Sequence, residues 1–348
     1  MRRARTRPAT PAPAGRATLA LSIALSLALA FTFAGARLAR AAAEASGTRV
    51  GAFLTTDPGA AVAARGGAGF ALGGDLQSTA LNPAALAGLG SGRFAFSHAT
   101  LAEGVASDWA AFGGRLGAGS LRYGVSGLLR SEGTIVGRDA ANQPTADAAA
   151  RSWALAFQLA RPLGPWLTLG GAARWVGERI GESGGDGLAF DAGAQGRAGA
   201  LSFGLSAQNF GGGMNWGGQR WRMPASLGAG VALEHAPSGL RFVFDLAAPA
   251  DYYRSARGGA EWRLRDRLAL RAGYRRELGA PPDDRGHGPA FGFGAGVGSM
   301  WLDYGFVLSS GGESVHRIGL DLRRLAHAEA PALAEAPPAA PAAAPELE

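Results

Sequence analysis

Short and long connections alternate along most of this 348-residue chain. Between Arg93 and Arg323 the sequence contains about fourteen segments with strand-like periodicity, joined by links of alternating length. The short links lie near 116–119, 161–165, 197–200, 235–239, 265–267 and 297–299, and the long links near 131–150, 179–187, 209–224, 249–257, 276–288 and 309–314. Outer-membrane barrels with an even strand number sort their connections in this way, whereas soluble sandwiches and propellers have no reason to do so. The alternation predicts an all-β, transmembrane antiparallel β-barrel over residues 92–324.

Apolar and polar side chains alternate within the predicted strands. Leu268, Leu270 and Tyr274 share one face of a segment, and Arg271 and Arg275 share the other. The same alternation runs through residues 152–160, 241–246, 302–308 and 317–323. A period of two with charge on one face indicates lipid outside and a polar lumen inside. The residues predicted to face the lumen include Arg271, Arg275, Asp303, Arg317 and Asp321.

The same face assignment predicts the effect of substitutions and the places of the tryptophans. Serine should be tolerated at Gly273 and Gly319, because both glycines fall on the lumenal face. Tryptophans on the outward face would form interfacial girdles at the membrane surfaces. On this parity the girdle tryptophans are Trp109, Trp153 and Trp175 near the outer rim and Trp262 near the inner rim. Each of the four could equally be an ordinary half-buried sheet residue.

All 34 basic residues of the chain are arginine, and its formal net charge is +7. These arginines are scattered and form no single basic stripe, so nucleic acid is not an expected partner. Guanidinium groups bind phosphate bidentately, so arginines in outer loops could bind lipopolysaccharide in addition to the surrounding outer-membrane lipid. The candidates are Arg138, Arg220, Arg222, Arg254 and Arg257. A GC-rich genome that encodes its cations as arginine is the simpler alternative for most of them.

The two ends of the chain differ in composition from the barrel. Residues 1–41 combine several arginines, an apolar stretch over 19–33 and an Ala39-Arg40-Ala41 cleavage site, which predicts a signal peptide for export. Residues 325–348 are rich in Ala and Pro and cannot bury a core, so we expect a disordered periplasmic tail. The barrel assembly machinery would then have to recognise an internal signal near residues 315–322. The chain has no cysteine, which excludes disulfides and thiolate metal sites.

Residues 42–91 precede the barrel and do not alternate as its strands do. Gly66 and Gly67 predict a flexible turn, and Asn82 followed by Pro83 predicts an N-cap and first helical position, with a short helix to about Leu89. A compact segment placed before the first strand is a candidate hatch or plug. Gly66, Gly67, Asn82 and Pro83 are therefore the candidate gate residues.

Several short motifs occur in the order shown by one family of membrane proteins. The sequence resembles the PorV/PorQ-type outer-membrane proteins, relatives of the FadL-type long-chain fatty acid transporters. The motifs are Ala64-Arg65-Gly66-Gly67-Ala68-Gly69-Phe70, Leu81-Asn82-Pro83-Ala84-Ala85-Leu86, Ser206-Ala207-Gln208-Asn209-Phe210-Gly211, Leu270-Arg271-Ala272-Gly273-Tyr274-Arg275, Leu302-Asp303-Tyr304-Gly305-Phe306 and His316-Arg317-Ile318-Gly319-Leu320. The resemblance implies a barrel of fourteen strands with an N-terminal hatch.

Residues that would indicate an enzyme are sparse. Gly181-Glu182-Ser183-Gly184-Gly185 matches G-x-S-x-G but lies in a glycine-rich link with no strand-to-helix elbow, so we predict no catalytic serine. The five histidines are isolated, and Asp283-Asp284 lacks the further spaced oxygens of a calcium loop, so no metal site is predicted. No dinucleotide or P-loop motif occurs, so no cofactor is expected.

Three functions remain open at this stage. The first is passive, FadL-like uptake of hydrophobic small molecules through a route gated at the hatch. The second is a PorV-like protein that binds secreted cargo of the type IX system, which requires ordered outer loops with exposed aromatics. The candidates for that binding surface are Trp216, Trp221, Tyr252 and Tyr253. The third is a scaffold anchored by the tail.

Overall fold

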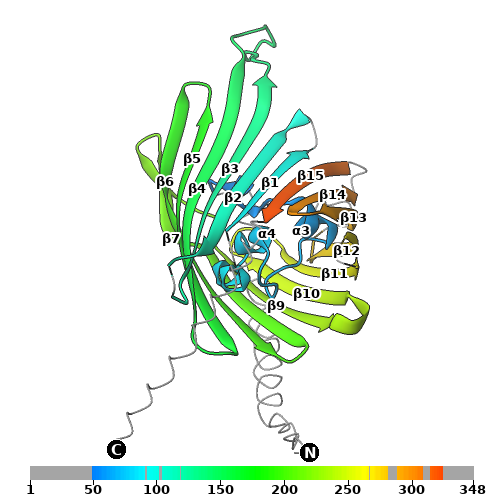
Figure 1. The fold of residues 1–348 in the computed structure, drawn as a ribbon. Coiled ribbons are helices and arrows are strands. Elements are labelled where there is room, and N and C mark those ends of the chain that lie inside the picture. Colours follow the sequence, from blue (N-terminus) through cyan, green and yellow to red (C-terminus); the bar gives the residue numbers. More distant parts are fainter. Residues whose placement is uncertain are drawn as a thin grey trace, which may run out of the picture.

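Antiparallel strands form a closed barrel in the computed structural model, which describes residues 49–323 except 91, 102–103, 118, 266, 281–287 and 309–313 (Figure 1). The predicted signal peptide, tail and Asp283-Asp284 pair therefore lie outside the described residues. The strands are β1 Arg93–Thr100, β2 Ala106–Arg115, β3 Arg122–Ile135, β4 Ala148–Pro162, β5 Leu167–Ile180, β6 Ser183–Ala198, β7 Leu201–Trp216, β8 Gln219–Arg222, β9 Ser226–His235, β10 Leu240–Pro249, β11 Arg254–Leu264, β12 Leu268–Leu278, β13 Gly288–Val297, β14 Met300–Leu308 and β15 Ser314–Arg323.

The barrel wall contains 14 strands, as the sequence predicts. β1 pairs with both β2 and β15, and β6 pairs with β7, which closes the ring. The short strand β8 pairs only with the end of β7 and extends one connection. Because Arg93 lies opposite Arg323, the first and last strand ends share one end of the barrel. We call this the inner end and the opposite one the outer end.

Two connections that the sequence predicts as long loops are β-hairpins instead. The expected loop over 179–187 is wrong, because β5 runs to Ile180 and β6 starts at Ser183, leaving a two-residue turn. Gly181 takes φ +58° there, which allows the tight turn. The expected loop over 209–224 is mostly strand, because β7 continues to Trp216 and turns into β8. Both predictions were wrong because glycine-rich strand segments were interpreted as loops.

The β3–β4 hairpin extends furthest beyond the wall at the outer end (Figure 1).

The outward face of the wall is apolar and the inward face is small and polar. In β4, Leu155 and Phe157 are exposed, whereas Ala156 and Gln158 between them are buried. Of the predicted girdle tryptophans, Trp175 and Trp262 are exposed on the outward face and Trp153 is half-buried with its ring 6.4 Å from that of Trp175.

The expectation for Trp109 is wrong. Its side chain is only 4% exposed and packs inside the barrel against a cluster that includes Leu76 and Leu86. The two faces of β2 are therefore the reverse of those predicted, and Asp108 is on the outward face. Its carboxylate lies 2.8 Å from Nδ1 of His98 on the neighbouring strand.

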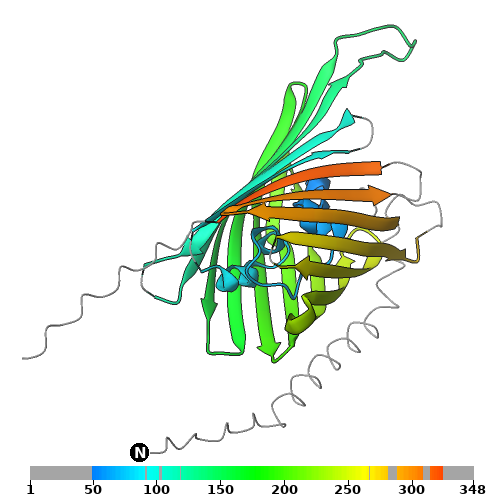
Figure 2. The ribbon, with the colours of Figure 1, turned by 45° about the vertical axis from the view of Figure 1, so that its right-hand side comes forward.

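Four short helices between Gly51 and Leu89 fill the barrel interior as a hatch (Figure 2). They are η1 Ala52–Thr55, α3 Ala60–Ala64, α4 Leu76–Thr79 and η2 Pro83–Gly88. α3 packs against β12 to β15, α4 against β1 and β2, and η2 against β3 to β6. Within the described residues, no helix is long and apolar enough to cross a membrane.

Glycines on the inward face let the hatch backbone approach the wall backbone directly. A Cβ at Gly273 would overlap the backbone of Arg65 and Gly66, and one at Gly305 would press on the carbonyl of Ala60. We call these wall glycines the glycine cradle: Gly170, Gly204, Gly259, Gly273 and Gly305. The expected tolerance of serine at Gly273 is therefore wrong. A Cβ at Gly319 would instead meet the Cβ atoms of Ala60 and Asp303 at 3.5 Å and the carbonyl oxygen of Phe96 at 3.6 Å, which are ordinary contacts.

Candidate functional site

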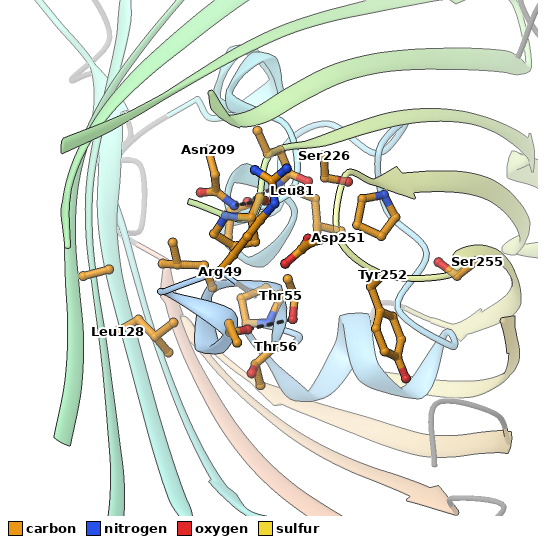
Figure 3. A pocket seen from close by; sticks show the side chains of 18 of the residues that line it. Arg49, Thr55, Thr56, Leu81, Leu128, Asn209, Ser226, Asp251, Tyr252 and Ser255 are labelled. Atoms are coloured by element: carbon orange, nitrogen blue, oxygen red, sulfur yellow. Dashed lines mark hydrogen bonds between the residues drawn. The ribbon is translucent and has the colours of Figure 1, made fainter. Parts of the chain in front are cut away.

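A cavity of about 390 Å³ lies between the hatch and the inner face of the wall, toward the outer end (Figure 3). The hatch contributes Thr55 and Leu81, the wall contributes Leu128, and the β10–β11 connection contributes Asp251 and Tyr252. Because hatch, wall and outer loop each supply part of the lining, any movement of the hatch changes the shape of this cavity.

The cavity is lined by both apolar and charged side chains. Its apolar lining comes from Leu54, Leu81, Trp109, Leu128, Ala154 and Ala156. Two of its lining arginines are paired: Arg174 with Asp191, and Arg275 with Asp57 at 2.6 Å. A mainly apolar pocket with a few placed polar groups is the usual form of a small-molecule site.

Arg257 is placed differently from the sequence expectation. It was grouped with outer-loop arginines that could bind lipopolysaccharide, but it belongs to β11 and lines the cavity. Its guanidinium donates to the carbonyl of Gly67 at 3.2 Å and to the hydroxyl of Ser255 at 3.0 Å. The long link assigned to 249–257 ends earlier than expected, since β11 starts at Arg254.

The four outer-loop aromatics separate into two groups. Tyr252 and Tyr253 line the cavity, and their ring centroids are 5.3 Å apart. Asp251 also lines the cavity; burial raises the pKa of its carboxyl group, although the positive charge of Arg49 acts to lower it. Trp216 and Trp221 belong to the β7–β8 hairpin, outside the cavity lining. The Trp221 indole donates to the Trp216 carbonyl at 3.3 Å.

Trp216 also has side-chain contacts with β6 and with a buried cluster. Its indole N–H donates to the Ser183 hydroxyl at 2.9 Å, and its ring packs against a buried cluster that includes Phe53, Met214 and Met223. The serine of the G-x-S-x-G match therefore begins β6 and supports a tryptophan. Among the described residues, no group of three or more His, Asp or Glu side chains could hold a metal ion.

Asn82 connects the hatch to the wall. Its side-chain oxygen accepts from the Ala84 N–H at 3.1 Å and caps η2, where Pro83 occupies the first position. Its amide donates to the Phe70 carbonyl at 2.9 Å within the hatch, and to the carbonyls of Ala194 and Leu205 in the wall, both at 3.2 Å. Asn82 is fully buried, so these contacts satisfy groups that no water reaches.

Gly66 and Gly67 form the turn that the sequence predicts between α3 and the next hatch segment. Their φ angles are +70° and +81°, which side chains with a Cβ rarely adopt. A Cβ on Gly66 would also overlap the backbone of Tyr274. These two residues position the hatch against β12.

The five predicted lumenal charges all lie inside the barrel, where most of them form ion pairs. Arg271 contacts Asp303 at 2.6 Å, and Asp321 accepts from Arg93 at 2.7 and 2.8 Å. Arg275 binds Asp57 of the hatch, and Arg317 is 4% exposed. Arg271 and Asp303 therefore neutralise each other, Asp321 is paired with Arg93 of β1, and Arg275 attaches the wall to the hatch.

Sequence reasoning missed the residue at the centre of this network. Glu261 of β11 is fully buried and accepts from Arg65 of the hatch at 3.0 Å and from Arg271 at 2.7 Å. Arg263 and Arg241 bind its other oxygen at 2.8 and 3.4 Å. The sequence does contain an indication of this role, because Glu261 is a single carboxylate at an inward-facing position of a strand.

Asp245 was assigned to the inward face, but its role was not predicted. Its carboxylate accepts from the backbone N–H groups of Gly69 at 2.6 Å and Phe70 at 2.9 Å. Together with Glu261 it fixes the middle of the hatch to β10 and β11.

The hatch carboxylates predict how its attachment depends on pH. Burial raises the pKa of Asp57, but the charges of Arg275, Arg257 and Arg317 outweigh it and hold the pKa below its ordinary 3.8. A depressed pKa stabilises the folded state above the unfolded value, and this contribution is lost as pH falls through the folded value. We expect the contribution of Asp57 to the protease resistance of the hatch, measured as the difference between the unmodified protein and Asp57→Asn, to be constant from pH 7 to pH 5 and to decline only below 3.8. A decline near pH 6 in the difference between the two proteins would contradict this account.

A closed wall of antiparallel strands, apolar outside and filled by a charge-anchored hatch, defines a membrane β-barrel with an internal plug. No family model and no curated protein matches the sequence. Solved structures do match the fold.

The toluene transporter TbuX of Ralstonia pickettii aligns with a TM-score of 0.54 at 15% identity, over 77% of this chain and 98% of its own. The toluene transporter TodX of Pseudomonas putida aligns with a TM-score of 0.57 at 12% identity, over 76% and 96% of the two chains. A FadL homologue of Pseudomonas aeruginosa aligns with a TM-score of 0.54 at 10% identity, over 76% and 98%. These likenesses show that the chain shares its fold with these three barrels, one of which is a FadL homologue, and none of the three is a PorV/PorQ-type protein.

Proposed function

We propose that this chain is an outer-membrane barrel that admits hydrophobic small molecules passively, past its hatch. The observation that carries the proposal is the cavity of about 390 Å³ beneath the outer loops, where apolar residues of both the hatch and the wall contribute to the lining. The fold is also that of barrels described as toluene transporters and as a monoaromatic hydrocarbon channel, at 12 to 15% identity.

Cargo binding is the less favoured alternative. It requires outer aromatics that are free to contact a protein partner. Tyr252 and Tyr253 instead line the cavity, and Trp216 packs on the cluster around Met214. These contacts support a role of the aromatics in shaping the cavity and its rim.

Uptake of an apolar fluorescent dye by cells whose lipopolysaccharide layer excludes it tests the proposal. Production of the protein should raise the uptake rate, and Ala156→Trp should abolish that rise because Ala156 is buried and lines the cavity. Ala272→Trp adds the same side chain to the exposed outward face of β12 and serves as the matched control. Equal uptake with and without the protein, at equal amounts of folded barrel, would refute transport.

Asn82→Ala should loosen the hatch and raise dye uptake. The variant loses the cap of η2 and leaves buried carbonyl groups without the amide, at a cost of about 2 kcal/mol. The wall should still fold, since its own hydrogen bonds close the ring. Uptake and the mobility of unheated protein on gels measure the two effects. Unchanged uptake with an intact barrel would show that Asn82 does not control the gate.

A further inference from the structure

We propose that the outward face of β4 and β5 binds the phosphorylated headgroup of lipopolysaccharide at the outer surface of the membrane. The inference goes beyond transport and depends only on the outer-membrane placement proposed above. The site consists of Arg151 and Arg179 and of two tryptophans next to them on the side of the inner end, Trp153 and Trp175. Burial alternates along both strands, and all four side chains are on the outward face.

Strand register places the two arginines directly opposite each other. Arg151 of β4 is the antiparallel partner of Arg179 of β5. Side chains at such positions have Cβ atoms about 4.5 to 5.5 Å apart, and like charges there destabilise a sheet. Both arginines are exposed, so their guanidinium groups can bind one ligand from the same side. A phosphate group bound by both would neutralise the repulsion through charge-assisted hydrogen bonds.

The carboxylates near these arginines have other partners or lie elsewhere. Asp186 is on the outward face of β6, but its carboxylate accepts from the Trp175 indole at 2.9 Å. Glu178 accepts from the Gly51 N–H at 3.2 Å inside the barrel, and Glu182 is in the exposed β5–β6 turn. Within the part of the chain that the structure describes, neither Arg151 nor Arg179 forms an ion pair.

An apolar band on β4 sets the level of the arginines in the membrane. Between Arg151 and Arg161 the outward residues are all apolar: Trp153, Leu155, Phe157 and Leu159. The stretch 152–160 has the length of a tilted membrane strand, roughly 9 to 11 residues. Arg161 is at the inner end of β4. Arg151 and its partner are therefore at the headgroup level of the outer leaflet.

The tryptophans favour a lipid over a soluble anion as the ligand. Their rings meet edge to face at 6.4 Å, at the boundary between the arginines and the apolar band. The ring of Trp153 lies against Gly177, where an added Cβ would overlap it, so it is fixed two residues from Arg179 along the wall. Indole rings concentrate at the interface between headgroups and acyl chains. A glycolipid with phosphates and acyl chains can bind the arginines and cover the apolar band together.

Native mass spectrometry of the full chain in non-ionic detergent tests the site. The probe is lipid A, the phosphorylated acyl anchor of lipopolysaccharide, and the reference ligand is lipid A without its phosphates. The phosphorylated form should bind about tenfold more tightly. The combined Arg151→Gln, Arg179→Gln variant should lose that preference.

A matched variant removes two exposed arginines from the inner ends of β2 and β4, Arg115→Gln and Arg161→Gln. It changes the net charge by the same amount and should keep the preference for phosphate. Gel mobility of unheated protein verifies that each variant is folded.

Four results would overturn the proposal. Equal binding of the two forms of lipid A would exclude phosphate recognition, and an unchanged preference in the Arg151→Gln, Arg179→Gln variant would exclude these arginines. Equal loss in both double variants would indicate general electrostatics, and competition by pyrophosphate as strong as that by lipid A would indicate a free-anion site. Because mass spectrometry measures binding without transport, failure of this site is distinguished from failure of the dye-uptake test.

Discussion

Glu261→Gln should lower the free energy of unfolding by about 3 to 5 kcal/mol, because it removes the fully buried carboxylate that four arginines share. Arg65 and Arg271 both have side chains only 2% exposed, and both bind this carboxylate. The amide of glutamine keeps the volume but supplies no charge. The measurement is urea unfolding of the barrel in lipid vesicles, with protease digestion to report release of the hatch.

Glu234→Gln is the matched control for this substitution. Glu234 pairs with Arg241 at 3.2 Å and Arg197 at 3.8 Å, but its side chain is 35% exposed. A solvated pair of this kind contributes less than about 1 kcal/mol. If both variants lost a similar amount of unfolding free energy, burial would not be the reason why the Glu261 ion pairs stabilise the protein.

Phe293→Arg should destabilise the inserted barrel by about 2 to 4 kcal/mol, because it places a charge on the outward face in contact with hydrocarbon. Phe293 is 51% exposed and has the apolar outward residues Leu270 and Tyr304 opposite it on the neighbouring strands. The same argument applies to Leu270, Phe306 and Leu320. Unfolding from vesicles measures the loss.

Gly319→Ser provides the comparison on the inward face. An added Cβ there has only ordinary contacts, so the variant should unfold within about 1 kcal/mol of the unmodified protein. If Gly319→Ser were as damaging as Phe293→Arg, the assignment of lipid and lumen faces would be wrong.

The wall could be predicted from sequence because successive residues of a barrel strand face lipid and lumen in turn, so apolar and polar side chains alternate along it. The alternation in residues 152–160 and 317–323 corresponds to exposed and buried positions of β4 and β15. The prediction for Trp109 was wrong because the wrong face of β2 was taken as the outward one. The barrel contains a hatch, so its interior also has apolar surface that a tryptophan can cover.

The candidate site was less predictable for a physical reason. Asn82 and Gly66 could be found because a helix cap and a left-handed turn depend on local backbone geometry. Glu261 and Asp245 depend on which hatch atoms lie opposite them, nearly 200 residues away in the chain. Turn signals also misled the reading of residues 179–187, where glycine serves extended strands.

The glycine cradle restricts how the interior can open. At Gly273 and Gly305 the hatch main chain lies directly against the wall, with no side chain between them that could swing aside. Rotamer changes on the picosecond to nanosecond scale therefore cannot open a path there. A hatch segment has to move as a body and break several hydrogen bonds together, which belongs to collective motion on the microsecond to millisecond scale. The rate of passage at this contact would therefore be set by main-chain motion and would not depend on the size of the permeating molecule.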